Sequence, residues 1–190
     1  MAHDIREDPA SQIHPYLGPG ERLLWTGRPD PDVRFAPVDA FLVPFSVMWG
    51  GFAVFWEATV IADGGPPFFV LWGIPFVLVG LYFVFGRFLY KKRRKRRTAY
   101  GLTDRRAIVA IGARSMSDSP VAGVVTSIKH SRDGSHVSIT FGQRSGWAAL
   151  SPSYANTGME LFEMGTQLVA FYDVAEPEPL LAALQQVRSG

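Results

Sequence analysis

The sequence predicts an α+β protein that consists of a transmembrane helical hairpin and a small antiparallel β domain capped by a C-terminal helix. Three observations predict this class. Two long apolar runs occupy the first half of the 190-residue chain, and short apolar runs separated by turn formers occupy much of the second half. The last residues then return to a helical spacing. A sheet with one apolar face needs such a helix to cover it.

The segment 1–38 is predicted to be a cytoplasmic N-terminal segment. Its first 35 residues lack the apolar stretch that is typical of a cleaved secretory signal. Within it, residues 21–28 are expected to form a strand, because Leu23 and Trp25 share one face at a period of two. This strand would join the sheet formed later in the chain. The alternative is that residues 21–35 are only a juxtamembrane linker.

The segment 39–90 is predicted to be a two-helix transmembrane hairpin. The run Ala40–Ile61 contains one ionisable residue, Glu57, and the run Pro67–Tyr90 contains one charged residue, Arg87. A helix rises about 1.5 Å per residue and must cross roughly 30 Å of hydrocarbon, so each run is long enough. The alternative is a pair of buried core helices in a soluble protein, but a chain of this size has little protein with which to cover them.

The segment 91–97 is a block of seven basic residues that directly follows the second apolar run. The positive-inside rule then predicts that both termini are cytoplasmic, because the short connection between the runs has no basic residue. Each Lys or Arg near anionic headgroups contributes on the order of 1 kcal/mol to membrane binding. Arg87 is expected to extend to the same interface. The predicted membrane-surface residues are Lys91, Lys92, Arg93, Arg94, Lys95, Arg96 and Arg97.

Two other interpretations of the block are a nuclear localisation signal and a nucleic-acid arm. The first requires a soluble eukaryotic protein, and the second requires the block to lie away from the membrane. Net charge is +2 for the whole chain, so the basic character is local. A nucleic-acid surface would instead spread basic residues along a face with aromatic residues among them. No nucleic-acid partner is therefore expected.

Glu57 is the one acid within a predicted span. It lies near the outer end of the first run, beside Trp56, and is expected to reach the headgroup region. The alternative is an intramembrane functional site for a proton or an ion.

The segment 98–190 is predicted to be a cytoplasmic β domain. Short apolar stretches between turn formers are typical of hairpins, and Asp133-Gly134 supplies a tight turn. The C-terminal helix is predicted from Leu180, Leu184 and Val187, which lie on one face. The expected strands are Thr98–Thr103, Ala107–Ile111, Pro120–Lys129, His136–Phe141, Met159–Met164 and Gln167–Tyr172.

The order of these parts resembles bacterial membrane proteins with a pleckstrin-homology-like (PH-like) domain. The resemblance covers most of residues 20–188. It implies a partly open β-barrel or sandwich of two sheets and a location in the bacterial inner (plasma) membrane, and its motifs specify no reaction. The residues that carry it are Gly20, Glu21, Leu23, Leu24, Trp25 and Gly27, followed by Tyr100, Leu102, Thr103, Asp104 and Arg106.

No catalytic, cofactor-binding or metal-binding residues are predicted. The chain has no cysteine, which excludes disulfides and cysteine-ligated zinc. His130 and His136 flank a turn and would be cross-strand neighbours if the loop has three residues, but no third ligand lies near them in the sequence. Arg105, Arg106 and Arg132 lie in loops of mixed charge and are expected to face solvent or to be paired.

The sequence therefore favours a non-catalytic, membrane-anchored PH-like interaction module. Its expected partners are anionic lipid headgroups and either another protein, as in an accessory subunit of a membrane complex, or further copies of itself. The alternative is an oligomeric membrane component that handles an ion, a proton or a lipid.

Overall fold

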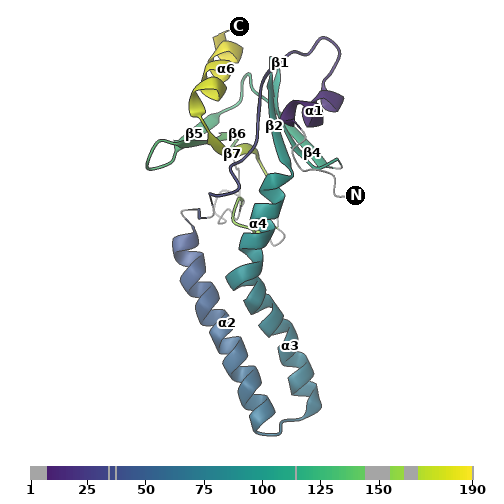
Figure 1. The fold of residues 1–190 in the computed structure, drawn as a ribbon, viewed down its shortest axis with the longest axis vertical. Helices are drawn as coiled ribbons and strands as arrows, with labels where there is room; N and C mark the ends of the chain where they lie inside the picture. Colours follow the sequence, from purple (N-terminus) through teal and green to yellow (C-terminus); the bar gives the residue numbers. More distant parts are fainter. Residues whose placement is uncertain are drawn as a thin grey trace. The chain divides into compact units, whose positions relative to one another are not determined.

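A computed structural model describes residues 8–33, 35–36, 38–113, 115–143, 155–160 and 167–189. The protein combines helices with two antiparallel sheets that do not close into a barrel, as well as two helices that are long and apolar enough to cross a membrane (Figure 1). The chain divides into two compact units. We call them the hairpin unit, residues 34–91 with 154–163, and the sheet unit, which contains the rest.

The hairpin unit contains the two predicted spans. Helix α2 (Asp39–Ala62) is joined by a short turn to α3 (Pro67–Leu81), which continues through one π-helical turn, η2 (Tyr82–Gly86), into α4 (Arg87–Arg96). Gly64 has a φ of 65° in the turn, a conformation that suits glycine. The second helix is therefore continuous over Pro67–Arg96 and includes most of the basic block, whereas the sequence suggested an end near residue 90.

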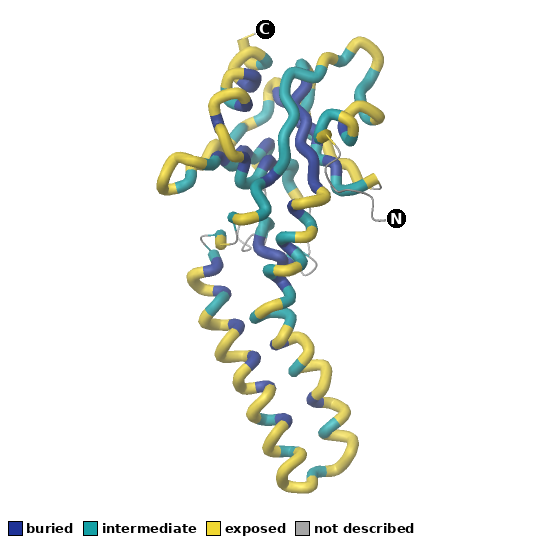
Figure 2. The backbone as a smooth tube through the Cα atoms, viewed as in Figure 1, coloured by how far each residue is buried: buried dark blue, intermediate teal, exposed yellow. Residues whose placement is uncertain are grey.

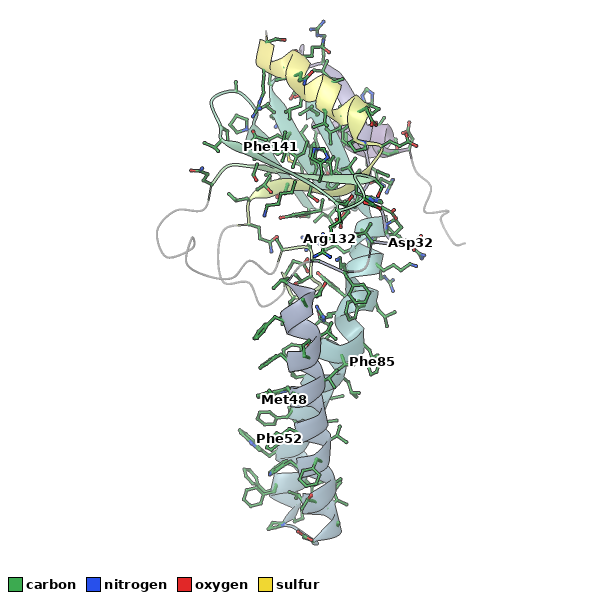
Figure 3. The ribbon with its side chains drawn as sticks, turned by 90° about the vertical axis from the view of Figure 1, so that its left-hand side faces the viewer. Asp32, Met48, Phe52, Phe85, Arg132 and Phe141 are labelled. Carbon is green, nitrogen blue, oxygen red and sulfur yellow. The ribbon has the colours of Figure 1, made fainter. Side chains whose placement is uncertain are left out.

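The outer surface of the hairpin is apolar. Met48, Phe52 and Phe85 are examples of large side chains that are mostly exposed, and Figure 3 shows them along the helices. Buried positions form a narrow stripe along each helix (Figure 2). An exposed apolar surface of this extent is typical of contact with lipid or with another protein.

The first sheet of the sheet unit has four antiparallel strands. They are β1 (Leu23–Gly27), β2 (Thr98–Thr103), β3 (Arg106–Ile111) and β4 (Ser115–Pro120), hydrogen-bonded in that order. The strand predicted at residues 21–28 is thus present as β1. It pairs with β2, which follows the hairpin in the chain.

The second sheet has three antiparallel strands and is followed by the C-terminal helix. The strands are β5 (Thr126–His130), β6 (His136–Phe141) and β7 (Val169–Ala175), and the helix is α6 (Pro177–Ser189). One hydrophobic core joins both sheets to α6. Its centre is Phe171, whose ring centroid lies 4.7 Å from that of Tyr100 and 5.2 Å from that of Phe141.

Two strand predictions are wrong. Residues 120–129 are not one strand, because the chain turns at Gly123, which has a φ of 73°, between β4 and β5. Met159 and Glu160 are not in a strand either, and residues 161–164 lie outside the described residues. The strand expected at 167–172 is present but displaced, as β7.

A short N-terminal helix covers the outer face of the first sheet. Helix α1 (Pro9–Ile13) begins at Asp8, whose carboxylate accepts a hydrogen bond of 3.1 Å from the Ala10 N–H, and a 3₁₀ turn, η1 (His14–Tyr16), follows it. Ile13 is fully buried against Gly101 of β2. A Cβ at Gly101 would lie 2.6 Å from Ile13 Cγ2, so glycine makes room for this contact.

Candidate functional site

The facing sides of the hairpin helices carry small and polar residues. On α2 the buried positions recur every three or four residues: Leu42, Ser46, Gly50, Ala53 and Glu57. On the other helix, Gly73, Gly80 and Arg87 are buried at a spacing of seven. A Cβ at Gly80 would lie 2.9 Å from Gly50 Cα, so the two backbones approach closely.

A buried ion pair lies at one end of these facing sides. Arg87 is 0% exposed, and its Nη1 donates to Oδ1 of Asp39, the first residue of α2. Arg87 Nε also donates to the Phe83 carbonyl at 2.9 Å, while Asp39 Oδ2 accepts from the Ala36 N–H at 2.6 Å. The expectation that Arg87 extends to a membrane interface is therefore wrong, because this carboxylate binds it inside the protein.

A segment from late in the chain packs against this ion pair. Arg87 Nη1 lies 3.5 Å from the carbonyl of Thr157, and the Tyr82 hydroxyl donates to the carbonyl of Gly158 at 2.5 Å. Gly158 has a φ of 84°, and a Cβ there would overlap the Arg87 carbonyl. Residues 155–160 thus belong to the hairpin unit, although the sequence predicted that Met159 begins a strand of the β domain.

Glu57 lies at the opposite end of the facing sides. It is 9% exposed and its carboxylate lies against Gly73 of α3. The structure places this carboxylate between the two helices, whereas the sequence favoured one that extends away from them.

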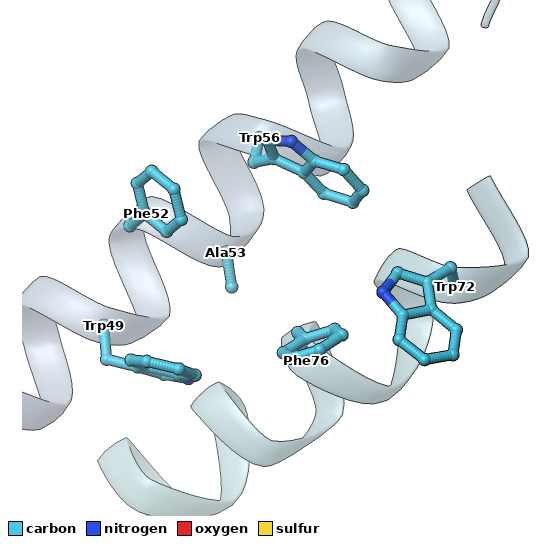
Figure 4. Close-up of a pocket in the computed structure, with 6 residues that line it drawn as sticks. All are labelled: Trp49, Phe52, Ala53, Trp56, Trp72 and Phe76. Atoms are coloured by element: carbon cyan, nitrogen blue, oxygen red, sulfur yellow. The ribbon is translucent and has the colours of Figure 1, made fainter. Parts of the chain in front are cut away.

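An aromatic pocket opens on the surface of the hairpin. Its volume is about 210 Å³. Figure 4 shows its lining, which comes from both helices: Trp49, Phe52, Ala53, Trp56, Trp72 and Phe76. This lining suits an apolar group.

The basic block divides into buried and exposed members. Lys91 and Lys95, one helical turn apart, are buried. Lys95 Nζ lies 2.5 Å from Asp173 Oδ2 and donates to the carbonyls of Asp30 and Val33 at 2.9 and 2.8 Å. An ammonium group has three hydrogens, and these three oxygens use all of them. Lys95 is therefore not available to lipid headgroups.

Other members of the block hold the same stretch of chain more loosely. Lys92 Nζ lies 3.1 Å from Asp32 Oδ1 at the surface, and Arg28 donates to the Arg96 carbonyl at 3.0 Å. We call the contacts of Lys92 and Lys95 with residues 30–33 and Asp173 the juxtamembrane clamp. Among the seven basic residues, the exposed ones are Arg93, Arg96 and Arg97. For these the predicted contact with anionic lipid stays a prediction.

Asp30 connects the clamp to the second sheet. Its Oδ2 lies 2.9 Å from His136 Nε2, and its N–H donates to the Asp173 carbonyl at 2.8 Å. Burial raises the pKa of Asp30, but the Asp32 N–H, His136 and Lys95 outweigh burial and hold that pKa below its ordinary value. His130 is paired with Val137, so the expected cross-strand neighbours His130 and His136 are not directly opposite. The described residues contain no group of three metal-ligating side chains.

Three of the residues that carried the family resemblance, Glu21, Thr103 and Arg106, form a second charged cluster at the first sheet. Arg106 Nε donates to Glu21 Oε1 at 2.9 Å, the Thr103 hydroxyl donates to the same oxygen at 2.7 Å, and the Gly18 N–H donates to Glu21 Oε2 at 2.8 Å. Arg106 is thus paired, as one of the two sequence interpretations held. Its hydrogen bond, with those from Gly18 and Thr103, outweighs burial and lowers the pKa of Glu21 to about 2.

This cluster predicts an acid-sensitive sheet unit. The pKa of Glu21 is lower in the folded chain than its ordinary value of 4.5, so its stabilisation is complete above pH 4.5 and is lost as the pH falls to about 2. The linkage amounts to about 3 kcal/mol. We expect Glu21→Gln to lower the unfolding free energy by about this amount at neutral pH and to have little effect near pH 2.

Urea unfolding of the full chain in micelles, followed by pulse proteolysis with an acid-active protease at low pH, measures this difference. Asp118→Asn is the matched control, because Asp118 also accepts a hydrogen bond from Arg106, at 2.8 Å, but is 41% exposed. We expect this control to change stability by less than about 1 kcal/mol. An equal effect of the two substitutions would contradict the assignment.

Comparison with known proteins adds no identification. No family model, no curated protein and no solved structure matches the chain.

Proposed function

We propose that this protein is a non-catalytic, membrane-anchored interaction module. The hairpin unit is its anchor, and the outer edge of strand β4 is the surface where the sheet unit binds an extended segment of a partner protein. The observation that carries the proposal is the exposure of β4. Five of its six residues are exposed, and the remaining one, Ser119, is partly exposed.

Strand β4 offers backbone groups for strand addition. It is the terminal strand of its sheet and pairs on one side with β3 from Arg106↔Pro120 to Ile111↔Ser115. No strand of the described part of the chain pairs with its other side. Natural sheets usually block such an edge with lysine, a bulge or a covering helix. An open edge is the geometry that β-augmentation uses.

The terminal strands β1 and β7 are largely buried or only partly exposed, and β5, the other exposed terminal strand, is less suited to this role. Strand β5 is exposed over four of its five residues, but one of these is Lys129. Lysine on an edge opposes pairing with another chain. The proposal therefore assigns the partner to β4.

The arrangement of the sheet unit supports the PH-like part of the proposal. The resemblance implies two sheets capped by one helix, and the sheet unit has two antiparallel sheets followed by α6. The proposed location is the bacterial inner membrane with both termini in the cytoplasm. Arg93, Arg96 and Arg97 are the exposed basic residues that would contact anionic lipid there, at about 1 kcal/mol each.

Co-purification from gently solubilised membranes tests this function. We expect a stoichiometric partner protein, and we expect Met116→Pro combined with Ser117→Lys to lower its recovery at least tenfold, because the pair adds a charge and removes the N–H of Met116, which faces the free edge. Gln185→Lys on the exposed face of α6 is the matched control and should leave recovery unchanged. Full recovery with the β4 variant, or purification of a homo-oligomer alone, would overturn the proposal.

A further inference from the structure

One oxygen of the Glu57 carboxyl group is buried without a hydrogen-bond partner among the described residues. Glu57 lies one turn before the end of α2, and its Oε2 is inaccessible to solvent. No hydrogen-bond donor among the described residues reaches this oxygen. A charged carboxylate with a buried oxygen that accepts no hydrogen bond is unfavourable, and binding of a neutralising group would lower this cost.

Helix α3 has a space for this carboxyl group. Gly73 lies against this group. A Cβ on Gly73 would overlap Oε2 of Glu57. It would also lie 2.7 Å from the carboxyl carbon of Glu57 and 2.7 Å from a ring carbon of Trp56. Any other residue at position 73 would push the carboxyl group out. The site is therefore formed by two helices and depends on a missing side chain.

The surroundings decide which species can neutralise the carboxyl group. Metal cations in proteins are bound by several oxygens. Here the atoms closest to Gly73 are the Glu57 carboxyl and the ring of Trp56, and the described residues hold no cluster of three metal-ligating groups. Among the described residues of the hairpin unit, the basic ones are Arg87 and Lys91, both at the other end of the helices. A proton needs only the one oxygen.

We propose that Glu57 is a proton-binding site of the hairpin, formed by its carboxyl group together with Gly73. This site goes beyond the proposed interaction at β4, since it would give the anchor itself a response to protons. It does not depend on that interaction, because the two sites belong to different units and share no residue.

Carbodiimide labelling of the full chain in lipid nanodiscs tests the site. In this reaction the carboxyl oxygen adds to the reagent's central carbon while the acid proton moves to its nitrogen, so a protonated carboxyl is required. We expect the apolar reagent dicyclohexylcarbodiimide to label Glu57 at least tenfold more than Asp63, which is exposed in the turn after α2. A water-soluble carbodiimide should give the opposite ratio.

Infrared difference spectroscopy on the same nanodiscs supplies a second measurement. A pH step should produce the carbonyl band of a carboxylic acid in the unmodified protein but not in Glu57→Gln. Gly73→Ala should displace the carboxyl group and lower its labelling several-fold, while Gly51→Ala, at a position with no atom within 4 Å, should not. Resistance of each variant to carbonate extraction verifies membrane insertion separately.

Two results would overturn the proposal. The first is labelling of Glu57 by the water-soluble reagent as readily as Asp63, which would describe a carboxylate at the headgroups. The second is an infrared spectrum that Glu57→Gln leaves unchanged.

Discussion

Replacement of Arg87 by methionine is expected to lower the stability of the hairpin unit by about 3–5 kcal/mol, because it leaves the carboxylate of Asp39 buried without its partner. The double replacement Asp39→Leu with Arg87→Met is expected to recover much of this loss, since it removes both charges together. Denaturation of the full chain by a graded addition of SDS to micelles, followed by circular dichroism, measures both effects.

Arg93→Met is the matched control for this experiment. Arg93 lies on the same helix and loses the same charge, but it is exposed, so its replacement should change stability by less than about 0.5 kcal/mol. Equal stability of the Arg87 and Arg93 variants would show that the ion pair does not hold the helices together. If the double variant were no more stable than Arg87→Met, the loss of stability would not come from leaving the Asp39 carboxylate without its partner.

Lys95→Met is expected to open the juxtamembrane clamp at a loss of about 3 kcal/mol. The Lys95 side chain is 5% exposed, and its removal leaves Asp173 and two backbone carbonyls without their donor. Hydrogen exchange should speed up at residues 30–33, which the ammonium group holds. Mass spectrometry of exchanged peptides from the full chain measures this change.

Lys92→Met provides the comparison within the same block. Its partner Asp32 is 75% exposed, and a surface ion pair contributes about 0–1 kcal/mol. We expect little change in exchange at residues 30–33. If both variants gave the same exchange rates, the clamp would not depend on the buried lysine.

The elements that follow from local pattern were largely predictable. Apolar runs of 22 and 24 residues fix the hairpin, and alternating residues fix β2, β3 and β6. Strand β4 was missed because its sequence, SMSDSP, has no buried face and therefore no apolar alternation. Helix α1 was missed because five residues are too few to show a helical period.

The contacts of charged residues were not predictable, because they depend on segments far apart in the chain. Arg87 lies 48 positions from Asp39, and Lys95 lies 78 positions from Asp173. Composition identifies a basic block but cannot separate Lys95 from Arg96, whose neighbours differ only after folding. A partial signal existed for Arg87, since Asp39 stands at the start of the other apolar run at the same end of the hairpin.

The pairing of β1 with β2 has a consequence for biogenesis. These neighbours are separated in the chain by the whole hairpin, with Leu23 opposite Thr103. In a membrane, an insertion error that left only one helix across the bilayer would place β1 and β2 on opposite sides of it. The first sheet would then lack its edge strand, and quality-control proteases would have an unfolded substrate. In a membrane, formation of the first sheet would therefore require that both helices cross the bilayer.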